Sequence, residues 1–69
     1  MKKTFGERLK ELRHEKGVGQ VELAEKIGVS KGIISLWENG LREPTLSNLL
    51  SLAEYFGVTL DYLAGLKDY

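Results

Sequence analysis

The chain has 69 residues, no cysteine, and ten basic residues balanced by ten acidic ones, so its formal net charge is zero. This length allows a single domain, residues 1–69, whose core is marginal because so short a chain buries only about 60% of its unfolded surface. The absence of cysteine excludes a disulfide framework and a thiolate metal site. No run of about 18 apolar residues predicts a membrane span, and no apolar stretch after the first lysines predicts a secretory signal. We therefore expect a cytoplasmic protein.

Glycines divide the chain into segments whose apolar residues recur with helical spacing rather than strand-like alternation. Phe5, Leu9 and Leu12 show this spacing in the first segment, and Thr4 with Glu7 forms a capping-box pattern at its start. In chain order, the predicted helices span about 4–16, 20–27, 31–38, 45–56 and 60–64. The sequence therefore predicts an all-α fold of five helices.

Helices this short, joined by short loops, must cross steeply around one core instead of forming a long bundle. The single tryptophan, Trp37, is the natural centre of that core. The predicted core residues are Leu9, Leu12, Leu23, Ala24, Ile27, Ile34, Trp37, Leu49, Ala53 and Phe56.

Residues 20–38 have the layout of a helix-turn-helix, in which a Gly-Val-Ser turn separates two short helices. Gly28 suits the turn because glycine readily adopts the positive φ of a sharp helix end. Ile34 and Trp37 direct one face of the second helix toward the core. The opposite face is left for solvent or a ligand, and it carries Lys31, Gly32, Ser35 and Leu36.

From about Phe5 to Gly65, the chain resembles the Xre, or Cro/cI lambda-repressor-like, helix-turn-helix family. The resemblance rests on Arg8–Arg13, Gln20, Leu23–Ser30, Ile34–Ser35, Trp37–Gly40, Arg42–Pro44, Leu52–Ala53, Gly57–Val58 and Leu60. It implies a compact five-helix DNA-binding domain, not an enzyme, whose third helix enters the major groove of double-stranded DNA.

The resemblance also implies roles for single positions. The residues matching base-contacting positions are Lys31, Gly32, Ser35 and Leu36. The residues matching phosphate-contacting positions are Gln20, Ser30, Asn39, Gly40 and Arg42. Arg13 and Glu38 match an ion pair that links the first helix to the end of the third. Because Gly32 has no side chain and Leu36 is apolar, we expect few hydrogen bonds to base edges. We therefore expect sequence specificity to depend more than usual on phosphate positioning and DNA shape.

The last quarter of the chain holds more large apolar side chains than one small core needs, namely Leu50, Tyr55, Tyr62, Leu66 and Tyr69. They either cap the monomer core and lie singly on the surface, or form a twofold dimer face. Such a dimer would place two recognition helices about 34 Å apart, which matches a palindromic operator. We expect a homodimer through Leu50, Tyr55, Tyr62 and Leu66.

The expected function is that of a prokaryotic or phage transcriptional regulator, of the repressor kind. Two alternatives remain open: an antitoxin-like or adaptor module that binds another protein, and a restriction–modification controller protein. The only histidine, His14, is expected at the surface, and no pattern indicates catalysis, a metal, a cofactor or a small-molecule effector.

The zero net charge conceals an asymmetry along the chain. Residues 1–42 hold nine basic and six acidic side chains, whereas residues 43–69 hold one basic and four acidic ones. The basic part contains the helix-turn-helix, so the overall charge does not argue against a DNA-binding function. A net charge of zero does predict modest non-specific affinity, since little long-range positive field surrounds the molecule.

Overall fold

A computed structural model describes residues 3–68, and this part of the chain forms five α-helices and no strand. In chain order they are α1 (Phe5–Lys16), α2 (Gln20–Ile27), α3 (Lys31–Glu38), α4 (Leu46–Phe56) and α5 (Leu60–Leu63). Each helix begins and ends within one residue of its predicted bounds, which confirms the all-α fold. Tyr69, one of the surplus apolar residues near the end of the chain, lies outside the described residues.

The helix ends form because local side chains satisfy backbone groups that a helix leaves unpaired. Thr4 and Glu7 make the predicted capping box at the start of α1. Hydroxyl groups of Ser30, Thr45 and Thr59 accept a backbone N–H at the starts of α3, α4 and α5. Gly28 ends α2 with a φ of 83°, and its N–H donates to the carbonyl of Ala24, as the turn chemistry predicts.

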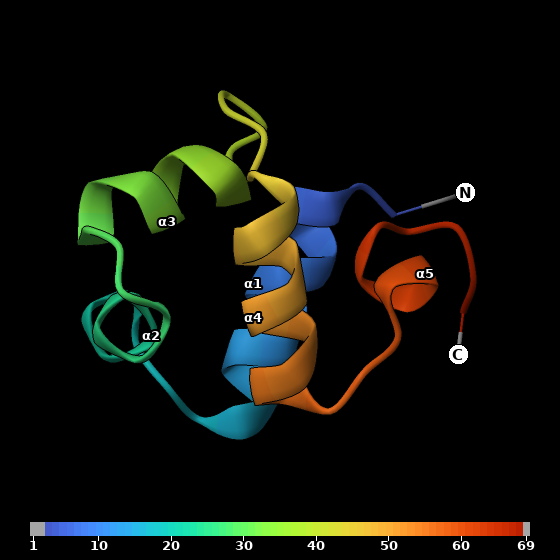
Figure 1. Ribbon diagram of the computed structural model, residues 1–69, viewed down its shortest axis with the longest axis horizontal. Coiled ribbons are helices and arrows are strands. Elements are labelled where there is room, and N and C mark those ends of the chain that lie inside the picture. Colours follow the sequence, from blue (N-terminus) through green and yellow to red (C-terminus); the bar gives the residue numbers. More distant parts are fainter. Residues whose placement is uncertain (1–2, 69) are drawn as a thin grey trace.

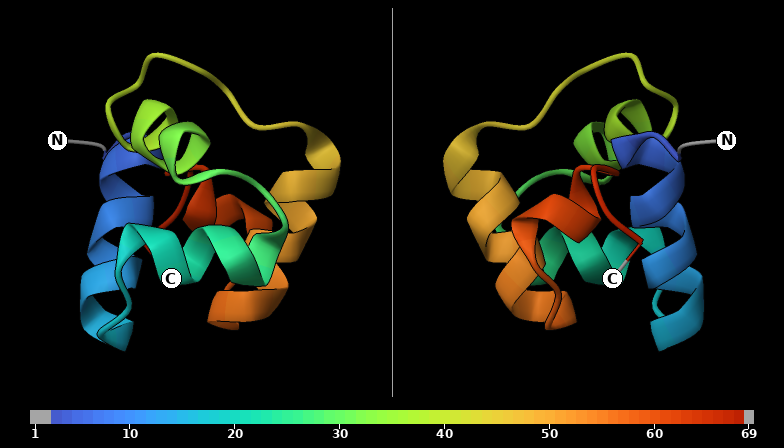
Figure 2. Two further views of the ribbon diagram at one scale, coloured as in Figure 1. Left: turned by 90° about the vertical axis from the view of Figure 1, so that its left-hand side faces the viewer. Right: turned by 90° about the vertical axis from the view of Figure 1, so that its right-hand side faces the viewer.

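The helices are arranged around a central pair. Helices α2 and α3 lie on one side of the molecule, α5 lies on the opposite side, and α1 and α4 stand between them (Figure 1). Helix α3 runs across one side of α2, and the loop after α3 arches over to reach α4 (Figure 2, left). Helix α3 packs on both α1 and α2, so one of its faces is covered by the fold.

All five helices contribute to one buried core, made of Leu9, Leu12, Leu23, Ala24, Ile34, Trp37, Leu52, Ala53 and Leu63. Three residues predicted for the core, Ile27, Leu49 and Phe56, are only partly buried and pack against its edge. Leu52 and Leu63 are fully buried although the prediction omitted them. The inward-facing residues of α4 are therefore centred on Leu52, and Leu49 and Phe56 lie about one turn before and after it.

Candidate nucleic-acid interface

Helix α3 has one face directed into the fold and one directed outward. On the inner face, Ile34 is completely buried and Trp37 keeps only 2% of its accessible surface. Positions three and four residues apart share one face of an α-helix. The outer face consequently brings together the four predicted base-contacting residues, of which Lys31 and Gly32 are exposed and Ser35 and Leu36 are half-buried.

A buried ion pair between α1 and α3 holds this face in position. Arg13 Nε donates to Glu38 Oε2 at 2.7 Å, and Arg13 Nη2 donates to Glu38 Oε1 at 3.0 Å. The two side chains keep only 10% and 4% of their accessible surface. Arg13 Nη1 also donates to the carbonyl of Val18 at 3.1 Å. This two-pronged contact ties α1, the loop before α2 and the end of α3 together.

Gln20, the first residue of α2, completes the cluster because its Nε2 donates to Glu38 Oε1 at 3.0 Å. Burial on its own would raise the pKa of Glu38, but hydrogen bonds from Arg13 and Gln20, and the positive charges of Arg13 and Lys10, lower it below the usual 4.5. Glu38 is therefore charged at neutral pH. One N–H of the Gln20 amide is used in this contact, and the other can donate to a ligand at the start of α2.

The start of α3 presents two polar groups to solvent. Ser30 is exposed, and its Oγ accepts the N–H of Ile33 at 3.2 Å, which leaves the hydroxyl hydrogen to donate outward. Lys31 is exposed beside it, and no carboxylate among residues 3–68 pairs with its ammonium group. These two groups point to a negatively charged or polar ligand at this helix end.

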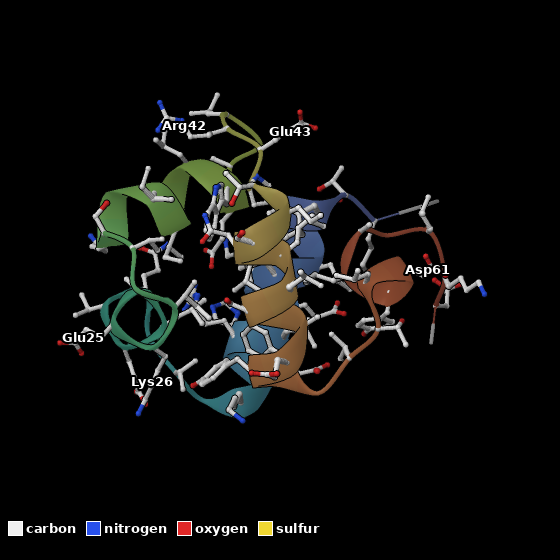
Figure 3. All side chains as sticks on the ribbon, in the orientation of Figure 1. Glu25, Lys26, Arg42, Glu43 and Asp61 are labelled. Carbon is white, nitrogen blue, oxygen red and sulfur yellow. The ribbon has the colours of Figure 1, made fainter. Side chains whose placement is uncertain are left out.

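At the other end of α3, most donors are engaged within the turn. Asn39 Nδ2 donates to the carbonyl of Ser35 at 3.0 Å and to its hydroxyl at 3.4 Å. The N–H of Gly40 donates to the carbonyl of Trp37 at 3.2 Å. Arg42 is different: it projects from the α3–α4 loop above α3 (Figure 3) and has no ion-pair partner among residues 3–68. Arg42 is thus an exposed cation in the loop beside the end of α3.

Gly6 has a structural role that the helical spacing did not reveal. It lies in the first turn of α1 against the end of α3. A Cβ atom at this position would be 2.5 Å from the carbonyl oxygen of Trp37 and 2.6 Å from that of Glu38. Only glycine allows α1 to approach the backbone of α3 this closely. No sequence signal identified this, because a glycine early in a helix is equally compatible with an exposed position.

Arg8 was also missed, although its position carried a signal. It lies on the same stripe of α1 as the buried Leu9 and Leu12, and it is buried itself. Its guanidinium lies 4.1 Å from the ring centre of Tyr62, and Nη2 is 3.4 Å from the carbonyl of Lys67. Arg8 therefore holds the segment after α5 against α1, which inward spacing of a basic residue would have predicted.

The residues predicted for a dimer face occupy two kinds of environment. Leu50 and Leu66 expose 51% and 61% of their accessible surface. Tyr55 lies 4.8 Å below the ammonium of Lys16, and Tyr62 is covered by Arg8, so both rings have partners within the monomer. The leucines remain accessible to another chain, and the tyrosines are only partly so.

Other kinds of site find no support in the described part of the chain. Among residues 3–68, no three His, Asp or Glu side chains gather closely enough to hold a metal ion. No helix formed by these residues is long and apolar enough to cross a bilayer. His14 is exposed on α1, as expected for a surface histidine. The exposed outer face of α3 and its flanking donors form the candidate nucleic-acid interface.

Residues 9–63 match the sequence profile of a family described as Helix-turn-helix. The chain is 40% identical over 65 residues to the HTH-type transcriptional regulator ImmR of Bacillus subtilis (strain 168), a match that covers 94% of this chain and 50% of ImmR. The matched region spans about half the length of ImmR, and about half the length of two other transcriptional regulators of the same organism, YqaE and YobD.

Several solved structures are similar to this fold, among them two DNA-related regulators. The P22 c2 repressor in complex with a synthetic operator superposes with a TM-score of 0.88 at 34% identity, covering 94% of this chain and 98% of that one. The restriction–modification controller protein C.AhdI from Aeromonas hydrophila gives a TM-score of 0.79 at 37% identity, covering 86% of this chain and 89% of that one.

Proposed function

The chain belongs to the helix-turn-helix family of DNA-binding regulators, which are not enzymes, and on this premise we propose that it is a sequence-specific transcriptional regulator of the repressor kind. Helix α3 enters the major groove of double-stranded DNA with its outer face toward the bases. One observation carries the proposal: four residues outside the buried core lie together on the outer face of a helix whose inner face is buried in that core.

The dimensions and chemistry of this face suit the major groove. A groove about 12 Å wide admits one α-helix. Lys31 can donate to O6 and N7 of guanine, and Ser35 can bond a base or a phosphate. The P22 c2 repressor, which has the same fold, was solved in complex with a synthetic operator, and this supports double-stranded DNA as the ligand.

Phosphate contacts flank the helix in this proposal. Ser30 offers an outward donor at the start of α3, and Arg42 offers a cation in the loop after α3. The amide of Gln20, which donates to Glu38 at the end of α3, has a second N–H left to donate. Asn39 and Gly40 contribute only if they release bonds within their turn. With few hydrogen-bonding groups on the outer face, phosphate positioning and DNA shape supply much of the specificity.

We further propose that two copies bind a palindromic operator as a twofold dimer. Leu50 on α4 and Leu66 after α5 supply exposed apolar surface, and Tyr55 and Tyr62 are the other residues of this proposed dimer face. Two recognition helices about 34 Å apart would enter successive major grooves. A prokaryotic or phage transcriptional regulator binds DNA in the cytoplasm, so we place the protein there. No small-molecule effector is part of this proposal.

Control of restriction–modification genes is a second candidate function, favoured by the likeness to C.AhdI over 89% of that chain. It shares the same DNA-binding mode, so the genes beside the operator distinguish it from other repression. An adaptor or antitoxin-like protein would instead have another protein as its main partner. That alternative predicts no enriched DNA site.

The proposal is tested by selecting bound sites from random duplex DNA and then titrating salt on the best site. We expect an enriched palindrome and an affinity that falls steeply as salt rises, because bound phosphates release counterions. Sedimentation with and without that duplex tests the dimer, which should form at least on DNA. A folded protein that enriches no site would overturn the proposal and favour the adaptor alternative.

A further inference from the structure

Arg8 is a buried cation whose polar groups are only partly satisfied. Its side chain keeps 6% of its accessible surface, and Nε has no hydrogen-bond partner among residues 3–68. Its ion pairs are long, because Nη1 lies 3.9 Å from Glu11 Oε1 and Nη2 lies 3.5 Å from Asp68 Oδ1. An apolar side chain of similar volume often replaces a buried charge without loss of stability. Filling the core therefore does not account for an arginine at this position.

The contacts that Arg8 makes hold the end of the described chain in place. Nη2 lies 3.4 Å from the carbonyl oxygen of Lys67, and the guanidinium lies 4.1 Å from the ring centre of Tyr62. The backbone N–H of Leu66 donates to the carbonyl oxygen of Asp61 at 2.8 Å, so Leu66 is placed together with α5. By contacting both Tyr62 and Lys67, Arg8 fixes α5 and the segment that follows it.

A close backbone contact holds the same segment from a second direction. Residues 65–68, which we call the tail segment, pass beside the start of α1 (Figure 2, right). Gly65 is buried there with a φ of 82°, and a Cβ atom at this position would collide with the carbonyl oxygen of Lys3. The tail segment is therefore fixed both by Arg8 and by the chain that precedes α1.

The proposed dimer face has two halves that the fold supports differently. Leu50 and Tyr55 lie on α4, a helix of eleven residues with two buried side chains. Tyr62 and Leu66 lie on and just after α5, a helix of four residues with one buried side chain. The second half therefore depends on contacts such as those of Arg8 to keep a fixed position.

We propose that Arg8 is a positioning residue for the dimer face, an inference that rests on the twofold dimer proposed above. Arg8 holds Tyr62 and Leu66 in the arrangement that a second copy binds. Without the guanidinium, the tail segment takes several arrangements, and only molecules with the right one associate. The apparent affinity between copies then falls with the fraction of molecules that are competent to bind.

The symmetry of the dimer enlarges this effect, because both copies must present the dimer face correctly. If about a third of the molecules keep the right arrangement, the association of two copies weakens about tenfold. The affinity of one copy for one half-site should not change. The tail segment follows α5, which lies on the side of the molecule opposite to α3 (Figure 1).

The test compares the affinity of the protein for the selected palindrome with its affinity for a duplex that carries one half-site. The wild type should bind the palindrome cooperatively. Arg8→Met should lower this cooperativity about tenfold and leave the half-site affinity within about twofold of the wild type. Its melting temperature should be unchanged or higher, because methionine fills the space without an incompletely paired charge. A purely structural role for Arg8 predicts the reverse, a lower melting temperature with intact cooperativity.

Two further variants act on the tail segment without changing Arg8. Gly65→Ala brings a Cβ atom against the carbonyl oxygen of Lys3, so the tail segment must move and cooperativity should fall. This variant decides the question if Arg8→Met does not fold. Asp68→Asn is the matched control, because it removes only a long ion pair of an almost fully exposed carboxylate. Cooperativity should persist in this control.

The outcomes separate this inference from the function on which it rests. Cooperativity like that of the wild type in the folded Arg8→Met and Gly65→Ala variants overturns the positioning role and leaves the proposed dimer intact. An equal loss of affinity for the half-site and the palindrome also overturns it, because Arg8 then acts on the single copy. If the wild type itself binds the palindrome without cooperativity, the proposed dimer fails and the inference fails with it.

Discussion

The inner and outer faces of α3 differ in what determines their residues. On the inner face, Ile34 and Trp37 are enclosed by the core, and Glu38 is held by Arg13 at 2.7 Å. On the outer face, the fold makes no use of the exposed Gly32, and no carboxylate of residues 3–68 pairs with Lys31. Within this helix of eight residues, the fold therefore constrains the inner positions, whereas it does not account for Lys31 and Gly32 on the outer face.

The contrast between the two faces shows where a binding function is located on this small domain. Changes on the inner face should lower stability, and they should alter binding only by disturbing the fold. Changes on the outer face should alter binding at nearly constant stability. Stability and binding measurements on single substitutions test this separation of the two faces.

The largest effect is expected on the inner side, from Arg13→Ala. This substitution leaves the carboxylate of Glu38 buried with only Gln20 as a partner, which should destabilise the protein by about 3–5 kcal/mol. Thermal or urea unfolding measures it, with Lys26→Ala, an exposed cation of α2, as the control. A nearly unchanged melting temperature for Arg13→Ala would refute the structural role of the ion pair.

The next largest effect is expected from Gly6→Ala. The new Cβ atom would meet the carbonyl oxygens of Trp37 and Glu38, so α1 and α3 must move apart. We expect a loss of about 1–3 kcal/mol in unfolding free energy, as for other overpacked sites. The same change at Gly32 is the matched comparison and should have the opposite sign. Two glycine substitutions with the same sign would remove the distinction between the faces.

A smaller effect is expected from Arg42→Ala in the loop after α3. Its side chain is exposed, so stability should change by no more than about 0.5 kcal/mol. Binding should weaken about equally for all sequences, and the slope of affinity against salt should fall by about one. Salt titrations of the wild type and the variant measure this. An unchanged slope would show that Arg42 does not contact phosphate.

The smallest effect is the pH dependence of the stability that the Arg13–Glu38 ion pair contributes. Because the folded state lowers the pKa of Glu38 below 4.5, its contribution is fully present above that value. The contribution is lost as the pH falls through the lower, folded pKa. The difference in unfolding free energy between wild type and Glu38→Gln should therefore be largest near neutral pH and shrink in acid. A constant difference down to pH 3 would contradict it.

The sequence predicted most of what the core determines. Periodic apolar residues and turn-forming glycines such as Gly28 locate each helix within one residue of its observed bounds, because these signals are local. Contacts between distant helices were harder to predict. The approach of Gly6 to α3 and the burial of Arg8 depend on how helices cross, which spacing along one helix does not specify.

The candidate site was predicted in position and less well in chemistry. The outer face of α3 could be identified because its residues lie opposite Ile34 and Trp37, which helical spacing assigns to the core. The engagement of Asn39 and Gly40 within their own turn could not, because it depends on the geometry of the helix end. Similarly, the partners of Tyr55 and Tyr62 are cations from α1, which only the tertiary fold brings together with these rings.

The placement of the outer face of α3 in the major groove is measured most directly at Lys31. Guanines of the selected operator are replaced one at a time by 7-deazaguanine, which removes the N7 acceptor from the major groove. Wild-type protein should lose affinity at one guanine in each half-site, and Lys31→Ala, with unchanged melting temperature, should show no such loss. Equal sensitivity of both proteins at every guanine would contradict the placement of this face against the bases.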